Sequence, residues 1–304
     1  MTIRLGYQIP NFSYGTPVSE LFPTVIRQAQ EADESGFDAV MVMDHFYQLP
    51  MLGSPDQPML EAYTALGALA TATKNVQLGT LVTGNTYRNP TLLAKVITTL
   101  DVVSGGRAVL GIGTGWFELE HDSLGFEFGT FTDRFNRLEE ALQIILPMFK
   151  GERPTFSGEW YRTKEALANP RLRDHIPLLI GGSGEKKTFR LAAAHFDHLN
   201  IIGGFDELPG KVDALEQRCE EVGRDPATLE TSMLVTALID DNASADHVPE
   251  PMKQRMVAGS ADSVAEQIKT KVLDAGLDGV IINLPFYSPG IVAKAAEALK
   301  PLVS

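Results

Sequence analysis

One motif recurs along the chain and limits the fold more than any other feature of the sequence. A helical stretch ends at or near a small residue, an apolar residue and Asp follow, and a nearly unbroken apolar run comes next. The motif occupies residues 34–43, 194–202 and 275–284, and a variant with two glycines occupies 104–113. Glycine suits the left-handed turn that ends a helix. Continuous apolar runs suit parallel strands that are buried on both faces, so the chain is predicted to alternate helices with such strands.

Eight strands can be placed in this way, and helical patterns fill the gaps between them. The predicted strands are 3–9, 37–43, 76–82, 107–113, 177–181, 198–202, 230–239 and 278–284. Eight alternating units predict an α/β fold in which a parallel sheet closes into a (β/α)8 barrel, the TIM barrel. An open doubly wound sheet is the alternative, but no Gly-x-Gly-x-x-Gly motif follows the first strand. We therefore predict a single barrel domain over residues 1–304.

Two stretches exceed the usual loop length, and we interpret them as insertions after the fourth and seventh strands. Residues 151–176 alternate around Ser157 and Gly158 like a β-hairpin. Residues 240–258 are polar and contain two prolines. Long insertions in barrels often cover the active site.

Composition restricts the partners of the protein. A formal net charge of −13 disfavours nucleic acid and anionic membranes as partners. No apolar run approaches the ~18–20 residues that span a bilayer, and the first residues do not resemble a signal peptide. Cys219 is the only cysteine, so no intrachain disulfide can form, which fits a reducing compartment. We expect a cytoplasmic protein that acts on a small molecule.

In such a barrel the chemistry lies where the strands end, at their C-terminal side. His45 stands at the end of the second predicted strand, next to Asp44. A histidine there can donate, accept or transfer a proton near neutral pH. The alternative is a loop histidine that only satisfies a backbone carbonyl. Glu120, in the loop after the fourth strand, is interpreted as a structural anchor of that loop.

Two glycine-rich turns follow strands. Residues 181–184 open a helix directly after an apolar strand, where free N–H groups and a Ser hydroxyl form an anion site; the alternative is a tight turn with solvated lysines after it. In 111–115, glycines could let a flat ring approach the backbone or could simply pack inside a narrow barrel, and for Thr114 and Gly115 we favour ligand contact. His195 and His198 have a metal-like spacing but precede a strand, and we predict no metal site.

With these residues identified, the chain resembles the luciferase-like monooxygenase superfamily over nearly its whole length, and within it the branch of coenzyme F420-dependent oxidoreductases. The motifs that carry the resemblance are residues 36–46, 78–90, 111–121, 133–141 and 177–186. The resemblance implies a homodimer that transfers hydride between F420, a deazaflavin, and an unidentified small organic substrate. An FMN-dependent luciferase-like monooxygenase is the alternative, and a non-enzymatic flavin-binding relic is a third possibility.

The resemblance also implies roles for residues at the strand ends. His45 is the expected acid/base, and a non-prolyl cis peptide is expected between Leu81 and Val82, behind the cofactor ring. The residues assigned to the cofactor are Asp44, Thr80, Leu81, Val82, Thr83, Thr114, Gly115, Gly181, Gly182, Ser183 and Gly184. Those assigned to the substrate are Gln8, Trp116 and Asn283.

The sequence departs from part of this branch at one position. Sugar-phosphate dehydrogenases of the branch carry a catalytic Glu directly after the Thr-Gly pair, where this chain has Trp116. The departure puts a sugar-phosphate substrate in doubt. Trp116 would instead form an apolar wall, which favours a less polar substrate.

Overall fold

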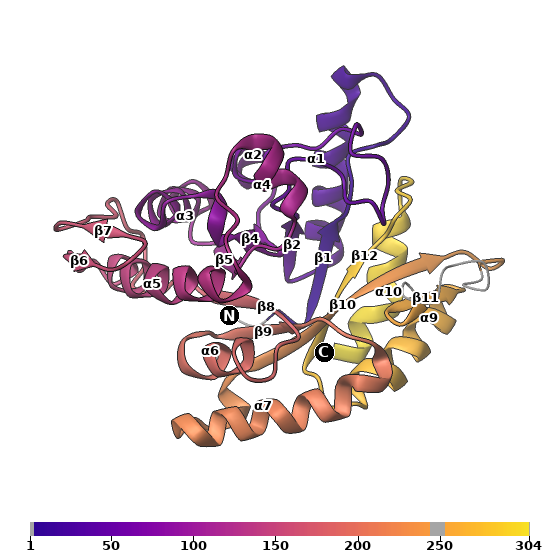
Figure 1. Ribbon diagram of the computed structural model, residues 1–304. Coiled ribbons are helices and arrows are strands. Elements are labelled where there is room, and N and C mark those ends of the chain that lie inside the picture. Colours follow the sequence, from indigo (N-terminus) through magenta and orange to yellow (C-terminus); the bar gives the residue numbers. More distant parts are fainter. Residues whose placement is uncertain (1–2, 244–252, 304) are drawn as a thin grey trace.

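A computed structural model describes residues 3–243 and 253–303 (Figure 1), and its centre is a closed ring of parallel strands. The strands of the ring are β1 Leu5–Ile9, β2 Ala39–Val42, β3 Gln77–Thr80, β5 Ala108–Gly113, β8 Leu178–Gly182, β9 His198–Ile201, β10 Glu230–Ile239 and β12 Gly279–Asn283. Each strand pairs in parallel with the next, and β12 pairs with β1 to close the ring. The predicted (β/α)8 barrel is confirmed.

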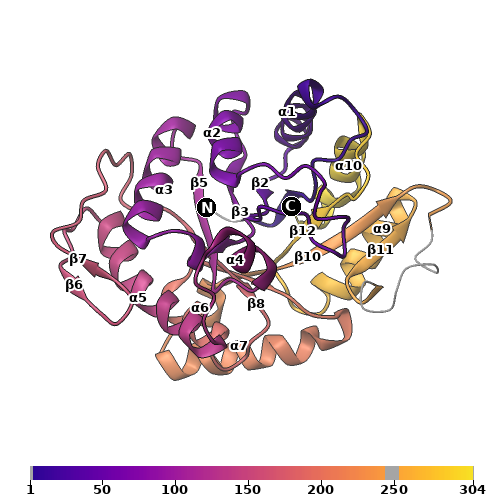
Figure 2. The same cartoon turned by 45° about the horizontal axis from the view of Figure 1, so that its top comes forward.

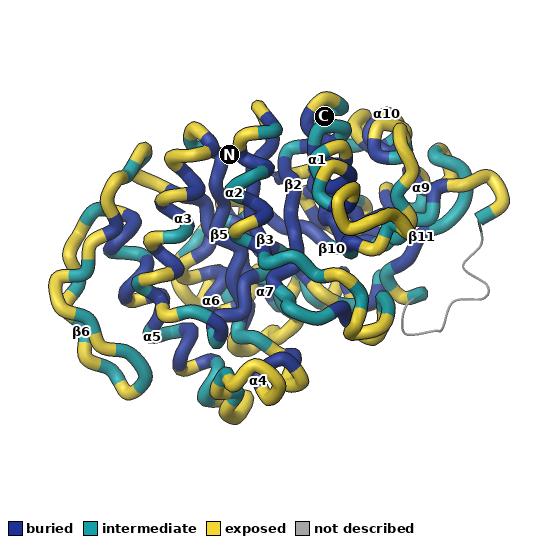
Figure 3. Tube along the Cα trace, turned by 90° about the horizontal axis from the view of Figure 1, so that it is seen from above, coloured by how far each residue is buried: buried dark blue, intermediate teal, exposed yellow. Residues whose placement is uncertain are grey.

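Helices surround this ring (Figure 2). They are α1 Val18–Ser35, α2 Ala62–Ala72, α3 Pro90–Ser104, α5 Phe131–Phe149, α6 Thr188–His195, α7 Leu208–Val222, α9 Ala261–Ile268 and α10 Ile291–Val303, with a short extra helix, α4 Glu118–Leu124, after β5. Four shorter turns of helix are η1 Asn85–Tyr87, η2 Phe205–Glu207, η3 Pro226–Thr228 and η4 Lys269–Leu273. The strands are buried, while the outer faces of the helices are exposed (Figure 3).

The Asp of the recurring motif explains why the motif precedes strands. In each case its carboxylate accepts a hydrogen bond from the first backbone N–H groups of the neighbouring strand in the ring. Asp38, Asp197 and Asp278 accept from the N–H groups of Leu5, Leu178 and Thr231 at 2.8, 2.8 and 2.9 Å. Buried or partly buried backbone donors need such partners. The motif thus fixes where adjacent strands begin relative to each other.

Glycines inside the barrel accommodate a bend after β3. The Leu81–Val82 peptide bond is cis, as predicted, and the chain then resumes pairing as β4 Thr83–Gly84 against β5. A Cβ atom added to Gly113 would lie 3.0 Å from Val82, and one added to Gly181 would lie 3.2 Å from it. A Cβ at Gly111 would overlap the carbonyl oxygen of Thr80. For Gly111 and Gly113 the structure therefore favours the packing explanation over close approach of a ring.

The first insertion contains the predicted hairpin, formed by antiparallel β6 Phe156–Ser157 and β7 Arg162–Thr163. It is anchored on α5, where the Glu140 carboxylate accepts three hydrogen bonds of 2.7–3.0 Å from the backbone N–H groups of residues 159–161. The hairpin lies beside α3 and α5 on the outside of the barrel (Figure 1). It does not extend over the ring of strands in that view.

In the second insertion, β11 Met256–Gly259 pairs in parallel with β10, and residues 244–252 lie outside the described residues. Across residues 3–243 and 253–303, no helix has the length and apolar character needed to cross a membrane.

Candidate active site

The ends of β2 and β5 bring His45 and Trp116 together. Their ring centroids lie 5.7 Å apart with an interplanar angle of 75°. Phe117 packs on the same imidazole at 5.8 Å. The His45 side chain is 12% exposed, whereas Trp116 is 54% exposed. An imidazole thus reaches the surface of the barrel end beside an open aromatic wall.

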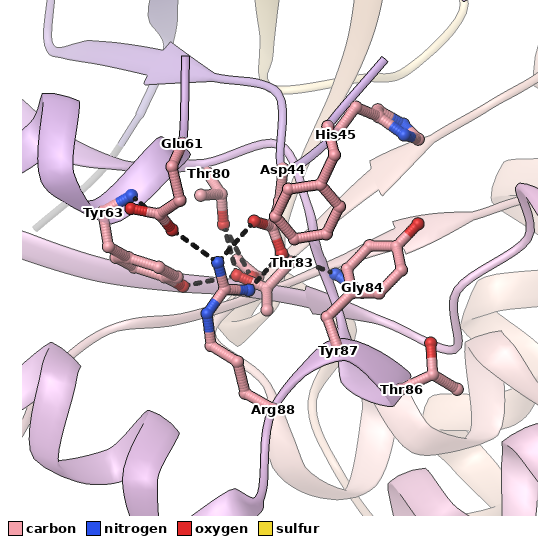
Figure 4. Close-up of polar contacts among 12 residues, drawn as sticks. Asp44, His45, Glu61, Tyr63, Thr80, Thr83, Gly84, Thr86, Tyr87 and Arg88 are labelled. Atoms are coloured by element: carbon pink, nitrogen blue, oxygen red, sulfur yellow. Dashed lines mark hydrogen bonds and ion pairs between the residues drawn. The ribbon is translucent and has the colours of Figure 1, made fainter. Parts of the chain in front are cut away.

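Asp44, the neighbour of His45, points the opposite way (Figure 4). Its carboxylate receives two hydrogen bonds from the Arg88 guanidinium, at 2.7 and 2.9 Å, and one from the N–H of Gly84. Arg88 also contacts Glu61 at 2.7 Å. Although burial opposes its charge, the carboxylates raise the pKa of Arg88 well above its usual value. Since Asp44 is 2% exposed, in this conformation it holds the loop after β4 and offers a ligand almost no surface.

Thr80 and Thr83, both assigned to the cofactor from the sequence, lie with no exposed surface. Their hydroxyls are 2.7 Å apart, Thr80 donates to the carbonyl of Gly111 at 3.1 Å, and the Tyr63 hydroxyl bonds Thr83 (Figure 4). These hydroxyls are used within the protein. In this conformation they support the bend at residues 81–82 and do not reach a ligand directly.

Gln8 and Asn283, assigned to the substrate, behave similarly. Asn283 donates to the Gln8 side chain at 3.2 Å, and Gln8 donates to the carbonyl of Leu81 at 3.3 Å. The two side chains are 2% and 5% exposed. They connect β12 and β1 to the bend after β3, which makes them supports of the site in this conformation.

Glu120 on α4 is the acceptor that organises the loop after β2. It is fully buried, and one of its oxygens accepts from the N–H groups of Phe46 and Tyr47, at 2.5 and 2.9 Å. The other oxygen lies 2.9 Å from Nδ1 of His45 and also accepts from the Tyr87 hydroxyl. Although burial opposes ionisation, hydrogen bonds from His45 and Tyr87 hold the pKa of Glu120 below its usual value. Glu120 was predicted to anchor its own loop, after β5; the structure shows that its carboxylate instead holds the loop after β2 and contacts His45.

The loops after β4 and β5 are joined by His121, which is 1% exposed. Its Nδ1 lies 2.8 Å from the carbonyl of Phe117 and its Nε2 lies 2.7 Å from the Thr86 hydroxyl. Thr86 in turn leaves no room for a side chain at Gly115, whose φ is +80°. Burial lowers the pKa of His121. Gly115 and Thr114 are therefore held in a fixed turn with part of their surface exposed.

The turn after β8 is the most open part of the candidate site. Gly181 and Gly182 are half-buried, and residues 183–187 are exposed. Helix α6 begins directly after them, and no side chain caps its first N–H groups. Lys211 binds the Ser183 carbonyl at 3.1 Å. Lys211 also pairs with Glu185 at 2.8 Å, so the groups here that can receive an anion are the free N–H groups at the helix start and the Ser hydroxyl.

Sequence reasoning missed several members of this site. Arg88, Glu61, Tyr63 and Tyr87 were not singled out, although Tyr87 and Arg88 lie within the 78–90 motif. One signal could have pointed to Arg88. Asp44 directly follows a buried strand, and a buried carboxylate needs a cation to compensate its charge.

Comparisons with known proteins agree with this geometry. The model of the luciferase-like monooxygenase family matches residues 3–247. The chain belongs to that family. It is 34% identical, over 77% of its length and 67% of the relative's, to an F420-dependent glucose-6-phosphate dehydrogenase of Microbacterium testaceum. It is 35% identical to a protein of the same name from Nakamurella multipartita, with 78% and 68% covered. These relatives confirm the predicted resemblance to the F420-dependent branch.

Two solved structures share the fold of this chain. An F420-dependent secondary alcohol dehydrogenase in complex with an F420-acetone adduct superposes over the full length of both chains, with a TM-score of 0.85 and 21% identity. A coenzyme F420-dependent tetrahydromethanopterin reductase from Methanopyrus kandleri does so with a TM-score of 0.78 and 18% identity. At these identities the likeness supports the fold alone.

Proposed function

We propose that this luciferase-like protein is an F420-dependent oxidoreductase that transfers hydride between the deazaflavin and a small organic substrate. The observation that carries the proposal is the placement of His45. Its imidazole stands at the C-terminal end of β2, beside Trp116, in a chain whose curated relatives bear F420-dependent names. When bound, the deazaflavin supplies the hydride chemistry, and the protein orients it and moves the proton.

Residues of two loops and one turn fit this cofactor. The phosphate would lie at the start of α6, against the N–H groups of Gly182 and Gly184 and the hydroxyl of Ser183, where the helix has no side-chain cap. The ring would lie against Leu81, Val82, Thr114 and Gly115, whose surfaces are partly exposed. Asp44, Thr80, Thr83 and Gly181 would support these contacts from behind.

In this proposal His45 exchanges the proton that accompanies the hydride. When an alcohol is oxidised, the cofactor would supply the hydride acceptor, and Nε2 of His45 would take the hydroxyl proton. When a carbonyl is reduced, the same proton returns to the oxygen. A positioned acid/base group typically contributes about 10²–10⁴-fold in rate.

The substrate we propose is small, largely apolar and not phosphorylated. Trp116 presents an exposed indole 5.7 Å from the His45 ring. Two arginines at this end of the barrel are already engaged, since Arg88 binds Asp44 and Arg134 donates to the carbonyls of Gly115 and Gly129. Neither is free to pair with a sugar phosphate beside this wall. Gln8 and Asn283 would not contact the substrate directly; they would influence it by holding the backbone at Leu81 in place.

We also propose a homodimer and a cytoplasmic location. An outward stripe on α3 carries Leu92 and Val103, which are 55% and 47% exposed, and both line a groove between α2 and α3. Apolar stripes of this kind are often covered by a second copy. A mass measurement in solution tests the dimer.

The cytoplasmic location is supported by the cysteine content. The single Cys219 is buried and free, which fits a reducing compartment.

The deciding experiment is a titration of purified apoprotein with F420 and with FMN, followed by fluorescence. We expect F420 to bind at least about tenfold more tightly, which is about 1.4 kcal/mol. Secondary alcohols, ketones and glucose 6-phosphate are then offered to the F420-loaded protein. Tighter binding of FMN would favour the monooxygenase alternative, and rapid turnover of glucose 6-phosphate would contradict the apolar substrate.

A further inference from the structure

The carboxylate of Glu120 contacts the imidazole of His45 on the side that faces the protein. Nδ1 of His45 lies 2.9 Å from an oxygen of Glu120, and that oxygen also accepts from the Tyr87 hydroxyl. The second oxygen is occupied by the N–H groups of Phe46 and Tyr47. Four donors on one fully buried carboxylate leave it little freedom to turn. The position of the imidazole is therefore set from behind.

The contact also determines where the imidazole carries its proton. An ionised carboxylate only accepts hydrogen bonds, so Nδ1 must be the donor. A neutral imidazole with its hydrogen on Nδ1 has its lone pair on Nε2. Across residues 3–243 and 253–303, no protein group forms a hydrogen bond with Nε2 of His45. The free nitrogen is thus the one that can receive a proton from a substrate.

The other groups around His45 do not compete for this role. Trp116 and Phe117 make edge-to-face contacts with the ring and provide no carboxylate. Asp44, the adjacent acid, is neutralised by Arg88. Tyr87 donates to Glu120 and forms no hydrogen bond with the imidazole. The charge that His45 meets directly is that of Glu120.

We propose that Glu120 is a positioning residue that holds His45 with its proton on Nδ1 and keeps Nε2 as the proton-exchanging atom. The proposal rests on the proposed function, because it assigns a purpose to Nε2. It adds to the structural role seen in the loop after β2, since the same carboxylate both fixes the backbone of residues 46–47 and orients the imidazole. Groups that hold a histidine through its second nitrogen commonly fix both tautomer and orientation.

The test is Glu120→Gln. The amide oxygen can still accept from the N–H groups of Phe46 and Tyr47. The NH₂ group must then face Nδ1 of His45, so Nδ1 can only accept a hydrogen bond from it. The ring is expected to move its proton to Nε2. We would measure this by ¹⁵N NMR of histidine-labelled protein without cofactor, at a pH where the ring is neutral. His45→Ala identifies the His45 signals among the six histidines.

The kinetic part of the test uses F420-loaded protein. Hydride transfer in Glu120→Gln should fall by about 10²–10⁴-fold, the range of a lost acid/base group. Cofactor affinity and KM should stay near wild type.

Glu140→Gln is the matched control. Glu140 also receives backbone N–H groups of a loop, at 2.7–3.0 Å, but no histidine. The Glu140→Gln variant should lose free energy of unfolding as Glu120→Gln does, because each weakens the anchoring of a loop. Its His45 NMR signals and its rate of hydride transfer should remain those of wild type. A role limited to anchoring would make the two variants behave alike.

The outcomes separate the two levels of the hypothesis. If wild-type His45 carries its proton on Nε2, or if Glu120→Gln leaves the tautomer unchanged, the positioning role is overturned. If the tautomer switches as expected but His45→Ala retains normal turnover, the positioning of the ring is supported and the acid/base role in the proposed function fails.

Discussion

The two ends of the barrel use buried polar side chains in different ways. At the N-terminal end they bind backbone: Arg107 makes five hydrogen bonds of 2.7–3.1 Å, four of them to carbonyl oxygens, and the motif aspartates bind the first N–H groups of neighbouring strands. At the C-terminal end they bind backbone as well, for example the N–H groups of Phe46, Tyr47 and Gly84, but they also bind one another. Asp44 pairs with Arg88, and Glu120 contacts His45.

The difference teaches how this chain separates stability from chemistry. A side chain that binds backbone fixes the strands whatever the loops contain. A side chain that binds another side chain can be exchanged or retuned without moving a strand. In barrels, residues at the C-terminal end carry the chemistry and those at the other end carry stability. Substitutions at the N-terminal end should therefore change the free energy of unfolding, and those at the C-terminal end should change cofactor affinity or rate.

The largest effect is expected for Arg107→Met. The guanidinium is nearly buried, and its removal leaves the carbonyls of Ala70, Val76 and Ser104 without their donor. We expect a loss of about 3 kcal/mol or more in the free energy of unfolding. Denaturant unfolding measures it, and F420 affinity of the folded fraction should not change. A weaker affinity at normal stability would show that the two ends are not separate.

A smaller effect is expected for Ser183→Asp at the opposite end. A carboxylate placed at the exposed turn before α6 would repel the cofactor phosphate, and we expect affinity for F420 to fall by about 10–100-fold, or about 1.4–2.7 kcal/mol. The melting temperature should stay near wild type, because residues 183–187 are exposed. Ser183→Asn is the neutral control of similar size. Equal affinities for the two variants would mean that no phosphate binds there.

The smallest effect concerns pH. Burial lowers the pKa of His121 in the folded protein, so the unfolded chain binds this proton more readily. Stability contributed by the neutral ring is present above about pH 6.5 and is lost as the pH falls below it. Melting temperatures of wild type and His121→Gln, compared between pH 7.5 and 5.5, should show the steeper decline in wild type. If the melting temperatures of the two proteins fell in parallel as the pH is lowered, His121 would not be the acid-sensitive contact of the C-terminal end.

The barrel itself could be predicted because its signal repeats. Each copy of the motif marks the end of a helix and the start of a buried strand, and the strand bounds agree within a few residues. The outward position of the β6–β7 hairpin could not be predicted, since the length of an insertion does not indicate which face it packs on.

The site was predicted less completely, because its contacts join distant residues. His45 was found from its place at a strand end, but Glu120 is 75 residues away and reaches it only once α4 folds over the loop after β2. The burial of Thr80 and Thr83 depends on the bend between them, which alternation along a strand does not reveal. Their assignment as direct cofactor contacts stays a prediction that the present conformation does not favour.

The close packing of Val82 against Gly111, Gly113 and Gly181 has a consequence for how relatives of this chain can diverge. A Cβ atom gained at position 113 or 181 would lie 3.0 or 3.2 Å from the isopropyl group at position 82, so that group would have to shift. A methyl group fits there more easily after position 82 has lost volume, so the order of the two changes matters. We expect these positions, which lie on three different segments of the barrel, to be replaced as linked sets during evolution. Directed evolution libraries that vary them one at a time would miss the permitted combinations.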